Sequence, residues 1–211
     1  MVCIKICGVK TPDIISVTAR AGARFVGFVF LSQSPRYVHP EQARLLSRQL
    51  PTGLSSVGLF VNPTDEELDH ILGSVAPDFI QLHGDETPSR VQTIKSRFQI
   101  PVIKSFGLSG PEDLEKVEPY LPVIDWILYD AKPQASSEMT GGNGVSFDWN
   151  LLKGKKFDKP WMLSGGLTRE NVAQALDILT PDAVDVSSGV ESTRGVKDAQ
   201  KIYDFIAAVR S

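Results

Sequence analysis

Residues 161–191, WMLSGGLTRENVAQALDILTPDAVDVSSGVE, contain one complete strand–helix–strand unit of the chain. The short apolar runs Trp161–Ser164 and Ala183–Val186 have the composition of buried strands. Between them, apolar side chains recur at helical spacing over residues 172–179, and Thr168 is the expected N-cap of that helix. A strand followed by a helix and a second strand is the repeating element of α/β proteins with parallel strands.

The same alternation extends outward from this unit over the whole chain, with strand candidates that begin roughly 20 to 36 residues apart. The six upstream candidates are Val2–Cys7, Phe25–Phe30, Ser55–Phe60, Phe79–His83, Val102–Ser105 and Trp126–Asp130. Eight strands with about eight helices fit either a closed barrel or an open, doubly wound sheet. Because Gly8-Val9-Lys10 follows the first strand in place of a dinucleotide-binding glycine fingerprint, we predict an α/β fold with a single (β/α)₈ barrel domain over residues 1–211.

Three helix starts support this division of the chain. Thr11-Pro12 and Thr87-Pro88 each place a hydroxyl at the N-cap and a proline at the first helical position. Thr64 is followed by Glu67 three residues later, which is the pattern of a capping box. We therefore expect a helix after the first, third and fourth strands.

Composition limits the class of partner. The chain has 211 residues and a net charge of −3, so it has no broad basic surface of the kind that binds nucleic acid or membranes. Its first residues form neither a signal peptide nor a membrane helix. Cys3 and Cys7, the only cysteines, would lie about 13 Å apart on one strand, too far for a disulfide. These features predict a reduced, cytoplasmic protein.

Alternation along the strands places several polar side chains inside the barrel. Cys7, His83 and Asp130 are expected to converge at the C-terminal mouth, where barrel enzymes keep their active sites. A buried cysteine, a turn histidine and a capping aspartate are the structural alternatives for these three residues. Lys5 and Asp185, on neighbouring strands, are expected to neutralise each other below that mouth.

Glycine-rich loops follow the seventh and eighth strands, at Gly165-Gly166 and at Ser187–Gly189. Barrels often bind phosphate with these two loops, because glycine lets the backbone approach a ligand closely. A tight turn is the structural alternative for each loop taken alone. The long segment Ala131–Ser146 after the sixth strand lacks helical periodicity, as functional loops often do.

Motifs along the whole chain, in a fixed order, resemble those of phosphoribosylanthranilate isomerases. They are Lys5-Ile6-Cys7-Gly8, Gly27-Phe28-Val29-Phe30, Ser34-Pro35-Arg36, Gln81-Leu82-His83-Gly84, Gly141-Gly142-Asn143-Gly144, Phe147-Asp148-Trp149, Leu163-Ser164-Gly165-Gly166-Leu167 and Asp185-Val186-Ser187-Ser188-Gly189-Val190-Glu191. The resemblance implies a barrel of the phosphate-binding type that acts on a small phosphosugar in tryptophan biosynthesis. It implies no cofactor and no metal, and family members occur as monomers and homodimers.

The resemblance also implies roles for individual residues. Cys7 matches the general base, Asp130 the general acid, and Arg36 the arginine that holds the anthranilate carboxylate. The other residues expected to bind substrate are His83, Gly144, Gly166, Ser187, Ser188 and Gly189. For Cys7 to act as a thiolate near neutral pH, we expect the site to lower its pKa from the ordinary value of about 8.5.

Two other functions fit parts of this pattern. Another phosphosugar isomerase or epimerase of the phosphate-binding barrel group would use the same loops, but an epimerase would want metal ligands or paired carboxylates at the mouth. The three histidines stand far apart in the chain. A non-catalytic phosphosugar-binding protein would need the loops but neither Cys7 nor Asp130.

Overall fold

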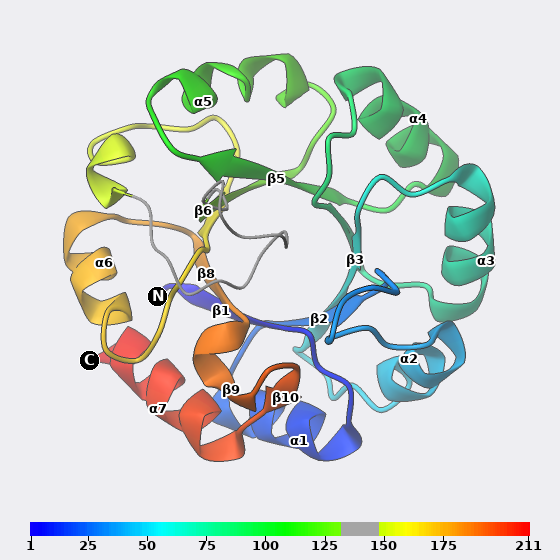
Figure 1. Cartoon of the computed structure of the whole chain (residues 1–211), viewed down its shortest axis with the longest axis horizontal. Coiled ribbons are helices and arrows are strands. Elements are labelled where there is room, and N and C mark those ends of the chain that lie inside the picture. Colours follow the sequence, from blue (N-terminus) through cyan, green and yellow to red (C-terminus); the bar gives the residue numbers. More distant parts are fainter. Residues whose placement is uncertain (132–147) are drawn as a thin grey trace.

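The computed structural model describes residues 1–131 and 148–211, and it contains a closed barrel of eight parallel strands surrounded by helices (Figure 1). The strands pair in chain order, and β1 closes the barrel against β8. Their bounds are β1 Cys3–Cys7, β2 Phe25–Val29, β3 Ser55–Phe60, β4 Phe79–Leu82, β5 Val102–Leu108, β6 Trp126–Ala131, β7 Trp161–Leu163 and β8 Ala183–Val186. The predicted (β/α)₈ barrel is therefore confirmed.

The α-helices of the described residues form the outer ring in Figure 1. Their bounds are α1 Pro12–Ala21, α2 Pro40–Ser47, α3 Asp65–Val75, α4 Pro88–Phe98, α5 Glu112–Glu115, α6 Val172–Ile178 and α7 Ala199–Arg210. Short 3₁₀ helices occur at η1 Glu118–Tyr120, η2 Trp149–Leu151 and η3 Ser188–Val190. After β6, the described part of the crossover contains η2 in place of an α-helix.

All eight predicted strands are present, and all but one end within a residue of the predicted bounds. The exception is β5, which continues to Leu108 because Phe106 and Gly107 pair with Tyr129 and Asp130 of β6. A hairpin of β9 Glu191–Thr193 and β10 Val196–Lys197, beyond β8, was not predicted.

The helix starts agree in part with the expected caps. Thr64 and Glu67 form the capping box, and the Thr87 hydroxyl accepts a hydrogen bond from the Arg90 N–H. Thr11 occupies the N-cap of α1 without a capping side-chain bond. The expected cap at Thr168 is wrong: α6 begins at Val172, because Asn171 Oδ1 accepts from the Thr168 N–H and closes a turn before the helix.

The inside of the barrel is apolar at its N-terminal end and polar above. Phe25, Val57, Ile103, Leu128 and Met162 fill the lower layer, and burying each such side chain contributes about 1.5–3 kcal/mol. On β1 the outward-facing Ile4 and Ile6 pack into the shell beneath the helices, as predicted. The inward-facing side chains of β1 therefore rise from Cys3 in the lower layer, through Lys5, to Cys7 at the mouth.

Both cysteines are free, in agreement with the expectation from their spacing. Within residues 1–131 and 148–211, no helix combines the length and apolar character needed to cross a membrane.

Candidate active site

A pocket opens at the C-terminal mouth of the barrel, and the structure places most of the predicted site residues on its wall. Cys7, Arg36, His83, Asp130, Gly166, Ser187 and Ser188 all line it. Gly189 lies just beyond the wall, where its backbone packs so closely on the Leu167 carbonyl that a Cβ would collide with it. Gly144 lies outside the described residues.

One side of this pocket is apolar, which the sequence did not reveal. Val29 and Leu59 pack against Cys7, and Leu31 and Val61 extend the same surface toward solvent. All four belong to β2, β3 or the residues just after them. Their alternation with outward-facing residues along β2 and β3 was the sequence signal that could have predicted this apolar wall. This apolar wall is suited to a flat hydrocarbon or aromatic group.

Cys7 is the last residue of β1 and is 5% exposed. Burial raises the pKa of its thiol, and the nearby Asp185 raises it further, against the lowering effects of the Lys5 and Lys197 charges. The expectation that the site lowers this pKa is therefore wrong for the ligand-free protein. The physical reason is desolvation, which the sequence pattern could not measure, since it depends on how completely neighbouring strands enclose the sulfur.

The titration of Cys7 can be measured directly. In a Cys3→Ser variant with ¹³C-labelled cysteine, the Cβ signal of Cys7 is expected to titrate with a midpoint above about 8.5, the ordinary thiol value. At pH 7 the thiolate would then be a few per cent of the population at most. A midpoint below 8 would show instead that Lys5 and Lys197 outweigh desolvation.

The predicted neutralisation of Lys5 by Asp185 is confirmed. Lys5 Nζ lies 2.9 Å from Asp185 Oδ1, and the Ser164 hydroxyl donates to Asp185 Oδ2 at 3.2 Å. Burial, which alone would lower the pKa of Lys5, is outweighed by the charges of Asp185 and Cys7, so that pKa is raised. Lys5 is therefore a permanent buried cation directly below Cys7.

Asp130 and His83 contact each other on the pocket wall. His83 Nε2 lies 3.3 Å from Asp130 Oδ2, while Asp130 Oδ1 accepts from the Ala131 N–H at 2.8 Å. Gln81 Nε2 lies 3.1 Å from His83 Nδ1, and Gln81 Oε1 is buried without a hydrogen-bond partner. Both carboxyl oxygens of Asp130 thus have a partner, and Asp130 is held at one orientation above the barrel.

The two glycine-rich loops form the wall opposite β3. Gly165 and Gly166 have φ of +87° and +63°, values that side-chain-bearing residues rarely adopt. A Cβ at Gly165 would also meet the Ala131 backbone N–H. Backbone amides and the hydroxyls of Ser187 and Ser188 therefore border the pocket without intervening side chains, an arrangement that can hold a phosphate group.

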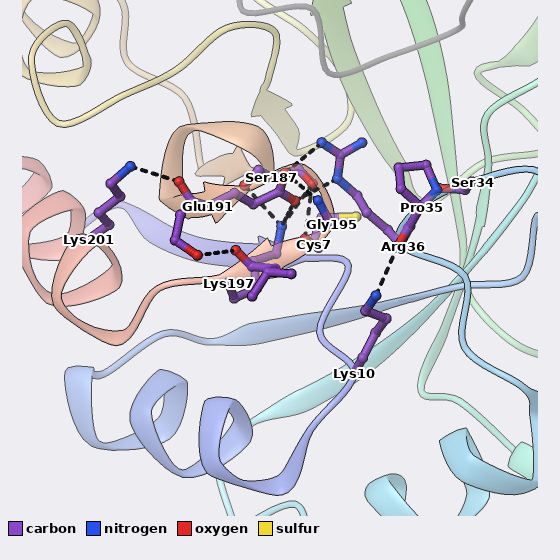
Figure 2. A network of polar contacts seen from close by, with 12 residues as sticks. Cys7, Lys10, Ser34, Pro35, Arg36, Ser187, Glu191, Gly195, Lys197 and Lys201 are labelled. Atoms are coloured by element: carbon purple, nitrogen blue, oxygen red, sulfur yellow. Dashed lines mark hydrogen bonds and ion pairs between the residues drawn. The ribbon is translucent and has the colours of Figure 1, made fainter.

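Arg36 reaches the pocket from the loop after β2, and the chain holds it with partners that the sequence interpretation missed. Its Nε and Nη2 donate to Glu191 at 2.7 and 3.0 Å, and Lys197 Nζ also donates to Glu191, at 2.7 Å (Figure 2). A glutamate and a lysine six residues apart, as at Glu191 and Lys197, are too common in sequences to predict an ion pair.

No group of three or more potential metal ligands occurs among the residues that the structure describes. The titratable groups on the pocket wall are the Cys7 thiol, the carboxyl groups of Asp130 and Asp185, the His83 imidazole and the Arg36 guanidinium. Such a set can move protons on an anionic small molecule.

The chain is similar in sequence to known enzymes over nearly its whole length. The family model described as "N-(5'phosphoribosyl)anthranilate (PRA) isomerase" matches residues 4–208. An N-(5'-phosphoribosyl)anthranilate isomerase of Paracoccus denitrificans is 50% identical over 206 residues, covering 98% of this chain and 96% of that protein.

Solved structures agree with the sequence comparison. Phosphoribosyl anthranilate isomerase from Thermotoga maritima superposes with a TM-score of 0.89 at 40% identity, covering 100% of this chain and 99% of that one. A phosphoribosyl anthranilate isomerase in complex with reduced 1-(o-carboxyphenylamino)-1-deoxyribulose 5-phosphate has a TM-score of 0.83 at 36% identity, with the same coverage. The chain therefore belongs to the N-(5'-phosphoribosyl)anthranilate isomerase family.

Proposed function

We propose that this protein isomerises N-(5'-phosphoribosyl)anthranilate to 1-(o-carboxyphenylamino)-1-deoxyribulose 5-phosphate, a step of tryptophan biosynthesis. The observation that carries this proposal is that Cys7 and Asp130 line one pocket together with the glycine-rich loops and Arg36. A phosphosugar that bears an aromatic carboxylate matches all parts of this pocket. We propose the cytoplasm as its compartment, since both cysteines are free.

The substrate would be held by three surfaces. Its phosphate would bind at Gly166, Ser187 and Ser188, with Gly189 allowing the two loops to pack closely. Its aromatic ring would lie on the apolar wall that includes Leu31 and Leu59, and its carboxylate would pair with Arg36. The apolar wall favours this substrate over a plain phosphosugar, which offers no group to cover it.

The reaction would proceed by proton transfers that begin at Asp130. The protonated Asp130 carboxyl donates to the ring oxygen, the bond from that oxygen to C1 breaks, and the nitrogen lone pair forms a C=N bond. The Cys7 thiolate then takes the proton from C2, the C–H electron pair forms a C1=C2 bond, and the π pair of the C=N bond returns to the nitrogen, which gives the enolamine. The enolamine becomes the ketone when its C2 hydroxyl proton passes to the Asp130 carboxylate and C1 gains the proton held by Cys7, which restores both groups.

Charges around Cys7 and Asp130 suit these roles. Lys5 and Lys197 would stabilise the thiolate that forms from the buried Cys7 thiol. If the amide group of Gln81 is turned so that its O and N exchange places, the unpartnered Oε1 accepts a hydrogen bond from His83 Nδ1–H. His83 Nε2 then carries no hydrogen and can accept the hydrogen of a protonated Asp130. We therefore assign His83 and Gln81 to orienting Asp130 in its acid form.

Turnover of N-(5'-phosphoribosyl)anthranilate by the purified wild-type protein, followed by the loss of substrate fluorescence, tests the proposal. We expect turnover at kcat above about 1 s⁻¹, the lower end of typical enzyme values. Ribose 5-phosphate should not be isomerised, because it lacks the ring and carboxylate. Absence of turnover with the anthranilate compound, in a protein that is folded, would refute the assignment.

A further inference from the structure

The β9–β10 hairpin lies outside the barrel sheet, yet it brings two charged residues to the active-site arginine. Glu191 is the first residue of β9, and Lys197, which pairs with it in register, ends β10. Their side chains are only 4% and 2% exposed. Figure 2 draws Glu191 with its contact to Arg36, and Lys197 with its contact to Ser187 of the loop after β8.

The contact between Arg36 and Glu191 fixes the guanidinium plane. Two parallel N–H donors, Nε and Nη2, meet the two carboxylate oxygens of Glu191 at 2.7 and 3.0 Å. Such a paired arrangement defines orientation as well as strength. A guanidinium has more N–H donors than Glu191 occupies, so donors of Arg36, which lines the pocket, remain for an anionic ligand.

Lys197 joins this pair to the loop after β8. Its ammonium donates to Glu191 Oε1 at 2.7 Å, to the Ser187 carbonyl at 2.9 Å and to the Ser187 hydroxyl at 3.1 Å. The Ser187 hydroxyl in turn donates to the Cys7 carbonyl at 3.1 Å. One ammonium therefore contacts both the support of Arg36 and a residue of the proposed phosphate site.

Two basic residues, Arg36 and Lys197, contact one acidic residue, Glu191. Burial lowers the pKa of Lys197, and the negative charge of Glu191 opposes that effect. Against the effect of burial, Arg36 and Lys197 lower the pKa of Glu191 to about 2, so it stays ionised at any pH near neutral. Glu191 thus orients Arg36 as a charged carboxylate.

The backbone near Arg36 is also closely packed. Gly195, at the turn of the hairpin with φ of +82°, donates its N–H to Glu191 Oε2, and a Cβ there would lie 2.5 Å from the Pro35 carbonyl oxygen. A Cβ at Gly8, just after β1, would lie 2.9 Å from the Arg36 Cδ. The hairpin therefore packs closely on Pro35, and the residue after β1 packs closely on the Arg36 side chain.

We propose that Glu191 and Lys197 are positioning residues with separable tasks. Glu191 orients Arg36 for the anthranilate carboxylate, and Lys197 links Glu191 to Ser187, so that the carboxylate and phosphate subsites keep a fixed relative position. This inference rests on the proposed function, since it assumes the carboxylate role of Arg36. A merely structural hairpin would instead affect both subsites equally.

Binding of two ligands to Glu191→Gln tests the task of Glu191. The product analogue, reduced 1-(o-carboxyphenylamino)-1-deoxyribulose 5-phosphate, carries both a carboxylate and a phosphate. Inorganic phosphate would occupy only the phosphate site. Losing an orienting charge-assisted contact should weaken binding of the analogue about ten- to a hundredfold, with KM rising in proportion and phosphate affinity changing less than about twofold. Lys197→Met should weaken both ligands, because it also releases Ser187.

Glu115→Gln is the matched control, since it makes the same substitution at an exposed position of α5. If Glu191→Gln fails to fold, Glu191→Asp keeps the charge but shortens the reach, and it should show the same selective loss of analogue binding. In an Arg36→Lys background, Glu191→Gln should add little further loss, because the oriented fork is already absent.

Each outcome decides the inference. Equal weakening of both ligands by Glu191→Gln, or unchanged binding of the analogue, would overturn it. Fully additive losses in the double variant would overturn it as well. A wild-type protein without turnover would instead count against the proposed function, so the two failures are distinguishable.

Discussion

Cys7→Ala is expected to lower kcat for N-(5'-phosphoribosyl)anthranilate by about 10²–10⁴-fold, the usual contribution of a positioned base. Alanine retains the β-carbon and removes the sulfur that would accept the C2 proton. No other group of comparable basicity is available from β1, because Lys5 below it is engaged by Asp185 at 2.9 Å. Binding of the product analogue should change little, since Cys7 is assigned to proton transfer and not to either anion.

Cys3→Ala provides the control for this variant. It removes a thiol from the same face of β1, in the apolar layer at the other end of the barrel, and should leave kcat within about twofold of wild type. Thermal melting of both variants separates loss of chemistry from loss of fold. If Cys7→Ala kept more than a tenth of wild-type kcat, a different base would have to be assigned.

Asp130→Asn is expected to lower kcat by a similar factor of about 10²–10⁴. Asparagine is nearly the same shape, and its amide oxygen can still accept from the Ala131 N–H, which lies 2.8 Å from Asp130 Oδ1. Its other terminal atom would face His83 Nε2, as Asp130 Oδ2 does at 3.3 Å. The substitution therefore keeps the local contacts and removes only the acidic proton that would open the sugar ring.

Asp177→Asn, at an exposed position of α6, is the matched control and should be indistinguishable from wild type. The Asp130→Asn variant should also bind the product analogue with nearly wild-type affinity, because ring opening precedes the bound product form. A loss confined to KM would show that Asp130 binds substrate without serving as the acid. Retention of wild-type kcat would remove it from the mechanism.

The barrel could be predicted because its signals are local. The strands Ser55–Phe60 and Ala183–Val186 were predicted with their observed bounds. A short apolar run between two capped helices fits a buried strand better than other structures. Helix starts were predicted less accurately. Thr168 was the expected N-cap, but α6 begins at Val172, because Asn171 accepts a hydrogen bond from the Thr168 N–H and closes a turn before the helix. Pairing with β6 likewise extended β5 beyond the predicted bounds.

For the site, the sequence by itself determined that Cys7, His83 and Asp130 meet at the mouth of the barrel. The strand period of two sent Lys5 and Cys7 inward, and chain order placed Lys5 beside Asp185. Because strand alternation is regular, it predicts which side chains face inward even on strands that are far apart in the sequence. The candidate acid and base followed from this alternation together with the family resemblance. The phosphate loops followed in the same way from glycines after the last two strands.

Only the tertiary structure decided how these groups are tuned and held. The pKa of Cys7 is raised because several strands together exclude water from its sulfur, an effect that no single segment encodes. Arg36 is oriented by Glu191, 155 residues away in sequence, through a hairpin too short to be predicted by periodicity. Desolvation and hydrogen-bond geometry depend on atoms from many segments at distances of a few ångströms, and a one-dimensional pattern does not specify those distances.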